Sequence, residues 1–133
     1  MLKTKSVHSA IEAADGWRIL ATRFRGRGLP TDRYDVWMAS LGPSEKLLKS
    51  VLAGKIPWAK FLQAYREEIF SPAAIDRDNA TIKNHGQKFT LRLIAKVAAR
   101  ENVTLLCHCA EDAQQCHRFA LAKLIAREIG AQT

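Results

Sequence analysis

Apolar residues follow two different periods along the chain, and these periods predict an alternation of strands and helices. Alternating apolar and polar residues predict strands over Leu2–Val7, at a sheet edge, and over Trp17–Phe24, in the middle of the sheet. Asp15-Gly16 is a turn signal before the second of these strands. The run VTLLC predicts a buried strand over Val103–Cys107, because it is short, apolar and β-branched in part. Residues 34–41 fit either a short strand or a helical turn.

Helical spacing of apolar residues predicts four helices. Ser44 and Thr90 are predicted N-caps of the first and third, and Pro57 begins the second. Asp112 is the predicted cap of the last helix, because Gln115 three residues later completes a capping box. The predicted inner faces are Leu47, Leu48, Val51 and Leu52; Trp58, Phe61, Leu62, Tyr65 and Ile69; Leu91, Ile94, Val97 and Ala98; and Leu121, Leu124, Ile125 and Ile129. The predicted stops are Gly54, Asn102 and Gly130.

The order of these elements predicts an α/β fold. A helix, a buried strand and a second helix in succession favour a mostly parallel sheet flanked by helices, with Rossmann-like layering. The 133 residues fit one domain, residues 1–133, with no linker or repeat. Residues 71–89 carry no clear period, which predicts either a short helix or a functional loop there.

Composition indicates a soluble globular protein. Apolar residues make up 47% of the chain and charged residues 26%. No apolar run approaches the roughly 20 residues that span a bilayer, and the first residues lack the apolar core and cleavage site of a secretory signal. Three cysteines, an odd number clustered within ten residues, suit a reducing compartment. We therefore expect a cytoplasmic protein with no membrane partner.

Positive charge is concentrated in the first half of the chain. Of the net charge of +8, residues 1–66 carry +7 and residues 67–133 carry +1. Arg18–Arg33 holds five arginines and one acidic residue, and arginine suits phosphate and carboxylate groups. The alternative is a solvated basic surface without a ligand. The ligand-binding residues predicted in this segment are Arg23, Arg27 and Gly28.

A second candidate site is the segment LLCHCAEDAQQCHR, Leu105–Arg118, in which a buried strand leads through a loop to a helix. Ligands of open α/β sheets bind beyond the carboxyl ends of the strands. The free N–H groups of a first helical turn attract anions. This geometry adds Glu111 and Arg118 to the predicted ligand-binding residues.

The cysteines of this segment allow a metal interpretation. Cys107, Cys109, Cys116 and His117 are ligand types for zinc or another thiophilic metal, and strand alternation places Cys107 and Cys109 on one face. The spacing C-x-C-x6-C-H is not the usual spacing of a structural zinc site.

Two other interpretations remain open beside the metal site. In the first, Cys109 or Cys116 is a catalytic nucleophile, His117 or His108 is its base, and Glu111 orients the base. A phosphatase loop of standard form is excluded, because it needs an arginine six residues after the nucleophile Cys109, a position that glutamine occupies. In the second, the cysteines are small core residues with no chemistry.

Four runs in this order resemble the bacterial domain-of-unknown-function 488 family, the YeaO-like proteins: DGWRILATRFRGRGL, WMASLGPS, FLQAYREEI and VTLLCHCAEDAQQCHRFALAKLI. The most specific pieces are Arg23 with Arg27-Gly28-Leu29, Trp37 with Leu41 and Pro43-Ser44, and Cys116-His117-Arg118. The resemblance covers nearly the whole chain. It implies a small α/β domain whose characteristic polar elements are the arginine loop and the Cys-His-Arg turn, and it implies no activity.

Three functions are compatible with these features. The first is a site for a small anionic ligand, bearing phosphate or carboxylate and including nucleotides, between the arginine loop and the Cys-His-Arg turn; whether it is catalytic is left open. The second, based on charge alone, is a nucleic-acid-binding module. The third is a protein-interaction module without catalysis, with Trp17, Trp37 and Trp58 in its core.

Overall fold

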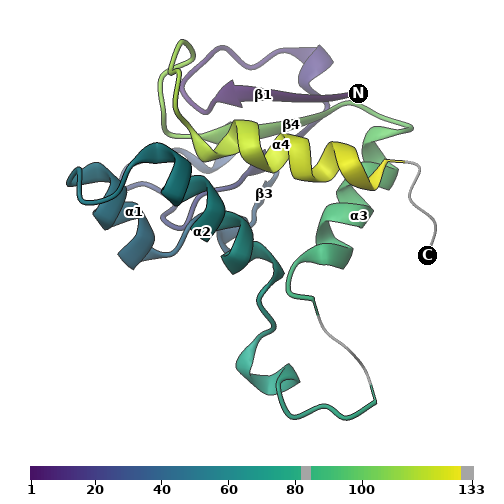
Figure 1. Ribbon diagram of the computed structural model, residues 1–133. Coiled ribbons are helices and arrows are strands. Elements are labelled where there is room, and N and C mark those ends of the chain that lie inside the picture. Colours follow the sequence, from purple (N-terminus) through teal and green to yellow (C-terminus); the bar gives the residue numbers. More distant parts are fainter. Residues whose placement is uncertain (82–84, 130–133) are drawn as a thin grey trace.

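The computed structural model describes residues 1–81 and 85–129 and contains a parallel four-stranded sheet (Figure 1). The strands lie in the order β1-β4-β2-β3, with bounds Leu2–Ser6 (β1), Trp17–Leu20 (β2), Val36–Trp37 (β3) and Val103–Cys107 (β4). The predicted α/β class is confirmed, with β1 at one edge and β2 inside the sheet. β2 ends at Leu20 rather than Phe24, because its partner β4 ends at Cys107.

The strand register brings three carboxyl ends to the same edge of the sheet. Ser6 pairs with Cys107, and Leu20 pairs with Leu106. The segments that follow β1, β2 and β4 therefore leave the sheet side by side. The arginine-rich segment follows β2, and the Cys-His-Arg segment follows β4, so the fold positions the two predicted sites next to each other.

Within the described residues, four α-helices accompany the sheet, with bounds Glu45–Leu52 (α1), Trp58–Phe70 (α2), Lys88–Ala98 (α3) and His117–Glu128 (α4). The predicted cap of α1 is confirmed, since the Ser44 hydroxyl accepts a hydrogen bond from the Leu47 N–H at 3.2 Å. The predicted stop Gly130 lies outside the described residues. Residues 71–87, where described, hold one short 3-10 turn at Ala74–Asp76 and extend away from the sheet (Figure 1).

Two predicted helix starts are wrong. α3 begins at Lys88 with Gln87 as N-cap, and the hydroxyl of Thr90 instead contacts the Gln87 side chain. α4 begins at His117 with Cys116 as N-cap, four residues after the predicted cap at Asp112. Residues 109–111 stay non-helical because their carbonyl oxygens bind a buried arginine described below.

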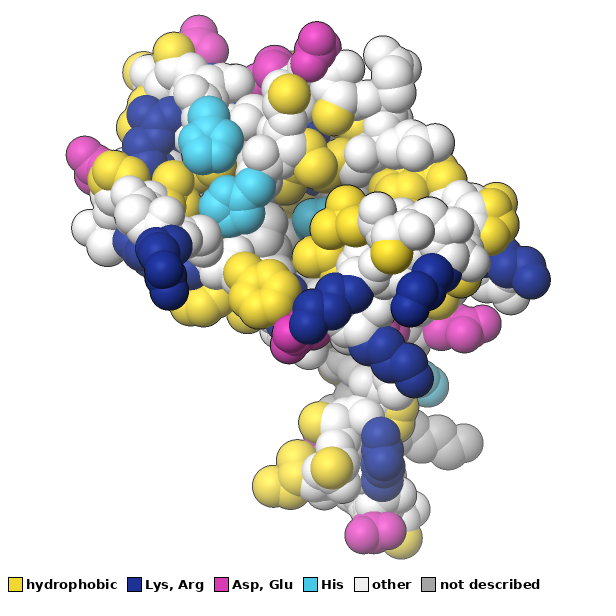
Figure 2. All heavy atoms as spheres, turned by 90° about the vertical axis from the view of Figure 1, so that its left-hand side faces the viewer, with side chains coloured by type: hydrophobic (Ala, Val, Ile, Leu, Met, Phe, Trp, Pro, Cys, Tyr) yellow, Lys and Arg dark blue, Asp and Glu magenta, His cyan; other side chains and the backbone are white. Residues whose placement is uncertain are grey.

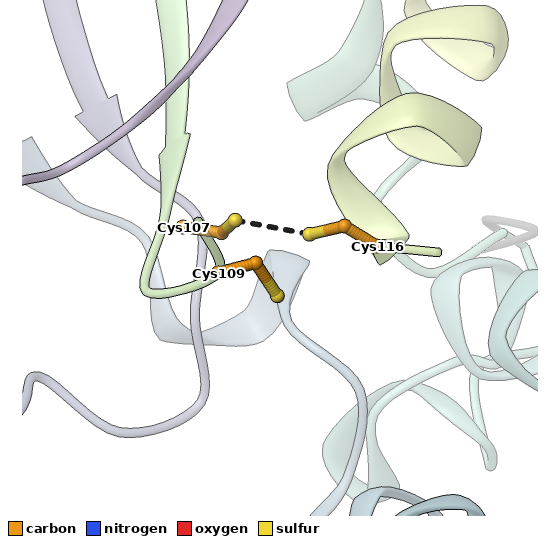
Figure 3. Close-up of side chains that lie close together, drawn as sticks. All are labelled: Cys107, Cys109 and Cys116. Carbon is orange, nitrogen blue, oxygen red and sulfur yellow. Dashed lines mark hydrogen bonds between the residues drawn. The ribbon is translucent and has the colours of Figure 1, made fainter. Parts of the chain in front are cut away.

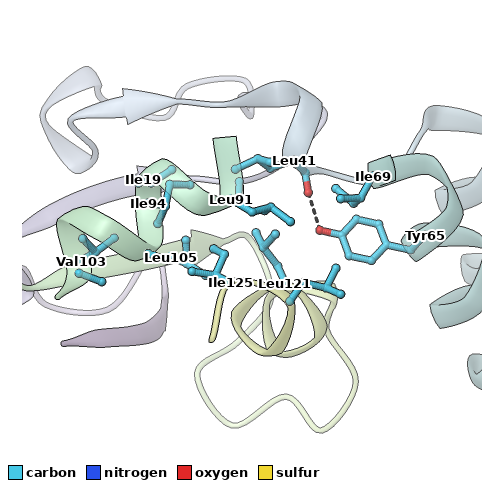
Figure 4. Packing of buried hydrophobic residues seen from close by; sticks show 14 of the residues in the cluster. Ile19, Leu41, Tyr65, Ile69, Leu91, Ile94, Val103, Leu105, Leu121 and Ile125 are labelled. Atoms are coloured by element: carbon cyan, nitrogen blue, oxygen red, sulfur yellow. Dashed lines mark hydrogen bonds between the residues drawn. The ribbon is translucent and has the colours of Figure 1, made fainter. Parts of the chain in front are cut away.

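The helices cover one face of the sheet. Side chains from α2, α3 and α4 pack there on Ile19 of β2 and Leu105 of β4 (Figure 4). Tyr65 of α2 is fully buried in this layer, and its hydroxyl donates to the Leu41 carbonyl at 2.5 Å. Burial of each large apolar side chain contributes about 1.5–3 kcal/mol, so this layer is the main source of stability.

The opposite face is covered by irregular segments instead of a helix. Its apolar cluster consists of Val7, Leu20, Leu29 and Leu106, with Tyr34 at its margin. Leu29 belongs to the arginine-rich segment, so this segment forms part of the covering layer. A loop layer cannot satisfy its own backbone carbonyls as a helix does, so other donors must supply those hydrogen bonds.

The prediction of three core tryptophans is wrong for two of them. Trp17 and Trp37 are 48% and 41% exposed. Both lie at the rim of the sheet, where the indole N–H groups reach the Glu101 carboxylate and the Thr22 carbonyl. Trp58 is partly buried and stacks on Phe61. Within the described part of the chain, no helix has the length and apolar character needed to cross a membrane.

Candidate functional site

The three cysteine thiols come together at the carboxyl edge of the sheet (Figure 3). Cys107 ends β4, Cys109 lies in the loop that follows, and Cys116 is the N-cap of α4. Their sulfur atoms all lie within 4.8 Å of one another, and the Cys107 and Cys116 sulfurs are 2.9 Å apart. Cys107 and Cys116 are buried, whereas Cys109 is half-buried. The cluster therefore has one side that solvent can reach.

Arg118 is fully buried beneath this cluster. Its guanidinium donates to the Cys107 sulfur at 2.9 Å and to the carbonyl oxygens of Cys109, Ala110 and Glu111 at 3.1–3.4 Å. The ring of Phe119 lies 4.7 Å from its central carbon. The loop thus turns acceptors inward, around a cation of the protein itself. A phosphate-binding loop turns N–H donors inward, so this loop is not such a cradle.

The electrostatics of the cluster concentrate negative charge on one sulfur. Hydrogen bonds with Cys107 and Cys116, followed by electrostatic interactions with His117 and Arg118, lower the pKa of the Cys109 thiol. Hydrogen bonds with Cys107 and Cys109 raise the pKa of the Cys116 thiol, and the hydrogen bond with Cys109 raises the pKa of Cys107. The direction of these pKa shifts favours the thiolate form at the more exposed sulfur.

His117 lies beside the cluster without belonging to it. Its Nε2 atom forms a hydrogen bond with the Ala21 carbonyl at 2.5 Å, and its ring packs edge-on against Tyr65. Burial lowers the pKa of this imidazole, which stays neutral. Because a carbonyl only accepts, Nε2 carries the proton. Of the four predicted metal ligands, the structure brings together the three cysteines and leaves His117 on a backbone oxygen.

Four of the five clustered arginines bind acceptors within the protein. Arg18 binds Asp15, and Arg23 binds the carbonyls of Gly42 and Pro43. Arg25 binds the Tyr34 hydroxyl and the Leu29 carbonyl, and Arg33 binds the carbonyls of Val7 and Ser9. Their guanidinium groups thus supply the hydrogen-bond donors that the backbone carbonyls of the loop layer need.

Arg27 is the exception among these five arginines: it is exposed and has no hydrogen bond or ion pair within the described residues.

The arginine loop touches the cysteine segment through Gly26 and His108. Gly26 has φ +96°, and a Cβ atom there would lie 2.5 Å from the His108 ring. His108 also contacts the Phe24 carbonyl through Nε2 at 3.2 Å. Glycine is therefore needed at position 26 for the arginine loop to pack against the His108 ring. Gly28, a predicted ligand-binding residue, has φ +78° and open space around it. Glycine is therefore favoured at this position by the backbone conformation of the turn, and not by a close neighbour.

Glu111 links two loops at the edge of the site. One carboxylate oxygen accepts from the Ser9 hydroxyl at 2.7 Å, and the other lies 3.8 Å from the Arg118 guanidinium. The side chain is about half exposed, at 52%. Glu111 thus joins the segment after β1 to the segment after β4.

His8 also lies at this edge of the sheet, and the sequence did not predict it as a site residue. His8 follows β1, and its ring lies 5.9 Å from the His108 ring. Both histidines follow the carboxyl end of a strand, which is the feature that could have paired them once β1 and β4 were known to be neighbours. Figure 2 shows this edge: two histidine side chains lie side by side, and a third lies at the bottom of a hollow.

The fold and the site define a small α/β protein with a three-cysteine cluster at the carboxyl edge of a parallel sheet. The chain belongs to the DUF488 family. The family model DUF488-N3a, described as "Active DUF488-N3 subclade", matches residues 2–129. The chain is also similar to "Uncharacterized protein YeaO" of Escherichia coli (strain K12), with 28% identity over 123 residues, 91% of this chain and 93% of the relative. No solved structure matches the chain.

Proposed function

We propose that this protein binds a small anionic ligand at the carboxyl edge of the sheet and presents the Cys109 thiol to it as a nucleophile. The observation that carries the proposal is the cluster of three thiols in which only Cys109 is accessible. Cys116, the other candidate nucleophile, is 3% exposed and lacks access to a ligand. Of the candidate thiols, Cys109 is therefore the one that a substrate can reach.

Positive charge around Cys109 supports an anionic ligand. Arg118 provides a buried cation, and α4 directs its N-terminal backbone N–H groups toward the cluster. Arg27 provides a guanidinium that is free to bind, on a loop that packs against His108. Arg23 and Arg118 already bind protein acceptors, so Arg27 is the predicted ligand residue with donors to spare. A phosphate or carboxylate group is the chemistry that this arginine suits.

The chemical step we propose is nucleophilic displacement. The Cys109 sulfur would form a bond to an electrophilic carbon or phosphorus of the ligand while the leaving group departs with its electron pair and takes up a proton. Water would then release the product and regenerate the thiol. The description of the matching family model as an active subclade supports a catalytic role.

Alkylation with a pair of reagents tests both parts of the proposal. Iodoacetamide is neutral and iodoacetate is an anion, so the ratio of their rates, normalised to free glutathione, measures the preference of the thiol for anions. We expect modification at Cys109 first, with Cys107 and Cys116 protected by burial. We expect a normalised ratio raised roughly fivefold, because opposite charges about 4 Å apart attract by about 1 kcal/mol even in water. Intact-mass and peptide mass spectrometry would measure both.

Two arginine variants provide a matched comparison. Arg27→Ala should return the ratio toward that of glutathione, whereas Arg100→Ala, an exposed arginine at the end of α3, should leave it raised. Inorganic phosphate should protect Cys109 in the wild type and less so in Arg27→Ala. Modification at Cys107 or Cys116 first would contradict the role of Cys109. A normalised ratio of one would contradict the anionic ligand.

The nucleic-acid hypothesis remains an alternative with less support. The charge that motivates it lies largely in arginines that bind protein acceptors, which leaves fewer guanidinium groups for phosphates. If it holds, affinity for duplex DNA or RNA should fall steeply with salt concentration, because each neutralised phosphate adds to the slope. A shallow slope in a fluorescence titration would exclude it. A protein-interaction role has no specific observation in its favour.

A further inference from the structure

We propose that Cys107, Cys109 and Cys116 form an open binding site for one zinc ion, with three thiolate ligands and a fourth position for water or a ligand. The site goes beyond the anion-binding function and does not depend on it, because zinc binding needs only the three sulfurs. The two roles of Cys109 belong to different states: its thiol is a free nucleophile in the metal-free protein and a ligand in the zinc-loaded protein. The three residues come from the end of β4, the following loop and the N-cap of α4. A bound ion would therefore join the strand to the helix.

The sulfur positions are close to those that zinc requires. Zn–S bonds of about 2.3 Å at tetrahedral angles place two sulfurs about 3.8 Å apart. All three sulfurs already lie within 4.8 Å of one another. The pair Cys107 and Cys116, at 2.9 Å, would have to open by about 1 Å.

The charges around the cluster favour a divalent ion. Three thiolates and Zn²⁺ carry a combined charge of −1, once the thiol protons have been released. The Arg118 guanidinium, 2.9 Å from the Cys107 sulfur, balances that charge. A buried group of zero net charge avoids the large cost of an uncompensated ion. The N–H···S contact is also the kind of outer interaction that orients a metal-bound thiolate.

The fourth coordination position is open on the solvent side. His117 binds the Ala21 carbonyl through Nε2. Within the described residues, the potential metal-ligand atoms that lie close enough together to hold one ion are the three cysteine sulfurs. Cys109 is half-buried, so the free position faces the accessible side of the cluster. Three protein ligands with a free position are typical of catalytic zinc, whereas structural zinc has four protein ligands.

Metal analysis of the full chain tests the site. The protein is purified under reducing conditions without chelator, incubated with zinc sulfate and freed of excess metal by gel filtration. We expect one zinc per chain, and X-ray absorption should show three sulfur neighbours and one oxygen. Less than half a zinc per chain would overturn the site. A fourth sulfur, or the scattering pattern of a coordinated imidazole, would overturn the open position.

Substitution of Cys109 provides the decisive variant, because this half-buried side chain can change with little effect on folding. Cys109→Ser should weaken zinc binding more than roughly 100-fold in competition with a chromophoric chelator, because even outer-sphere partners account for 10–100-fold. His8→Ala, which removes an exposed histidine at the same edge, should leave the affinity unchanged. An unchanged affinity in Cys109→Ser would overturn the site. The iodoacetate preference, measured on metal-free protein, is independent of these outcomes, so failure of one proposal is distinguishable from failure of the other.

Discussion

Replacing Arg118 with alanine should lower the free energy of unfolding by about 3–5 kcal/mol, because removal of a buried charged partner leaves several groups uncompensated. The side chain is fully buried, and it donates hydrogen bonds to three consecutive carbonyl oxygens of residues 109–111 and to the Cys107 sulfur. Without it the buried Cys107 sulfur and three partly buried carbonyl oxygens lose their charged donor, and a cavity remains beside Phe119. Since small domains have only about 5–15 kcal/mol of stability in total, the variant should be close to unfolding at 37 °C.

Urea denaturation in the presence of a reducing agent measures this effect. Arg118→Lys keeps the charge but loses the planar fork that reaches several oxygens at once, so we expect it to recover only part of the stability. Arg100→Ala is the matched control, because that arginine is exposed, and its effect should stay within about 0.5 kcal/mol. A loss below about 1 kcal/mol in Arg118→Ala would show that the loop does not need its internal cation.

Replacing Asp15 with asparagine should also cost about 3–5 kcal/mol, because it leaves buried cations without their counter-ion. Asp15 is fully buried between two strands, where its carboxylate binds Lys5 at 3.1 Å, Arg18 at 2.5 Å and Lys3 at 3.3 Å. Lys5 and Arg18 are themselves 9% and 4% exposed. The asparagine side chain would retain a neutral acceptor but would not balance their charge. The control is Asp32→Asn, an exposed carboxylate in the arginine loop, with an expected effect within about 0.5 kcal/mol.

The effect of Asp15 should depend on pH. Burial by itself would raise the pKa of this carboxyl, but hydrogen bonds from the Glu12 backbone N–H and from Lys5, Lys3 and Arg18 outweigh burial and hold the pKa well below its usual range. A carboxyl with a lowered pKa stabilises the folded state fully above its unfolded pKa, about 3.9, and loses that contribution as the pH falls further. The difference in stability between wild type and Asp15→Asn should therefore be constant from pH 7 to pH 5 and shrink below about pH 4. A difference that does not change down to pH 2.5 would contradict this assignment.

The periodicity of the sequence was sufficient to predict most of the fold. Strands β1, β2 and β4, the cap of α1 and most of the inner faces of the helices follow from local patterns, because each depends on neighbouring residues. The prediction is wrong for Leu52 and Ile129, which lie at or beyond the ends of their helices and are 77% and 50% exposed. The start of α4 could not be predicted in this way. The sequence Asp112 to Gln115 fits a capping box, but Arg118 binds the carbonyl oxygens of residues 109–111 just before it, and the helix begins at His117.

Local patterns in the sequence predict the class of fold and place each candidate segment after a strand, because hydrophobic periods and strand ends are local properties; the sequence motifs also indicate the family. The tertiary structure was needed to show that β2 and β4, which precede the two segments, are neighbours. It was also needed to show which arginines are free, which thiol is accessible and which histidines meet. Arg33 satisfies the Val7 carbonyl across 26 residues, and His8 meets His108 across the sheet. Such contacts depend on partners that are distant in the chain. The sequence therefore shows only that arginines are concentrated in one segment, whereas the fold shows that most of them hold loops in place and that Arg27 has no partner among the described residues.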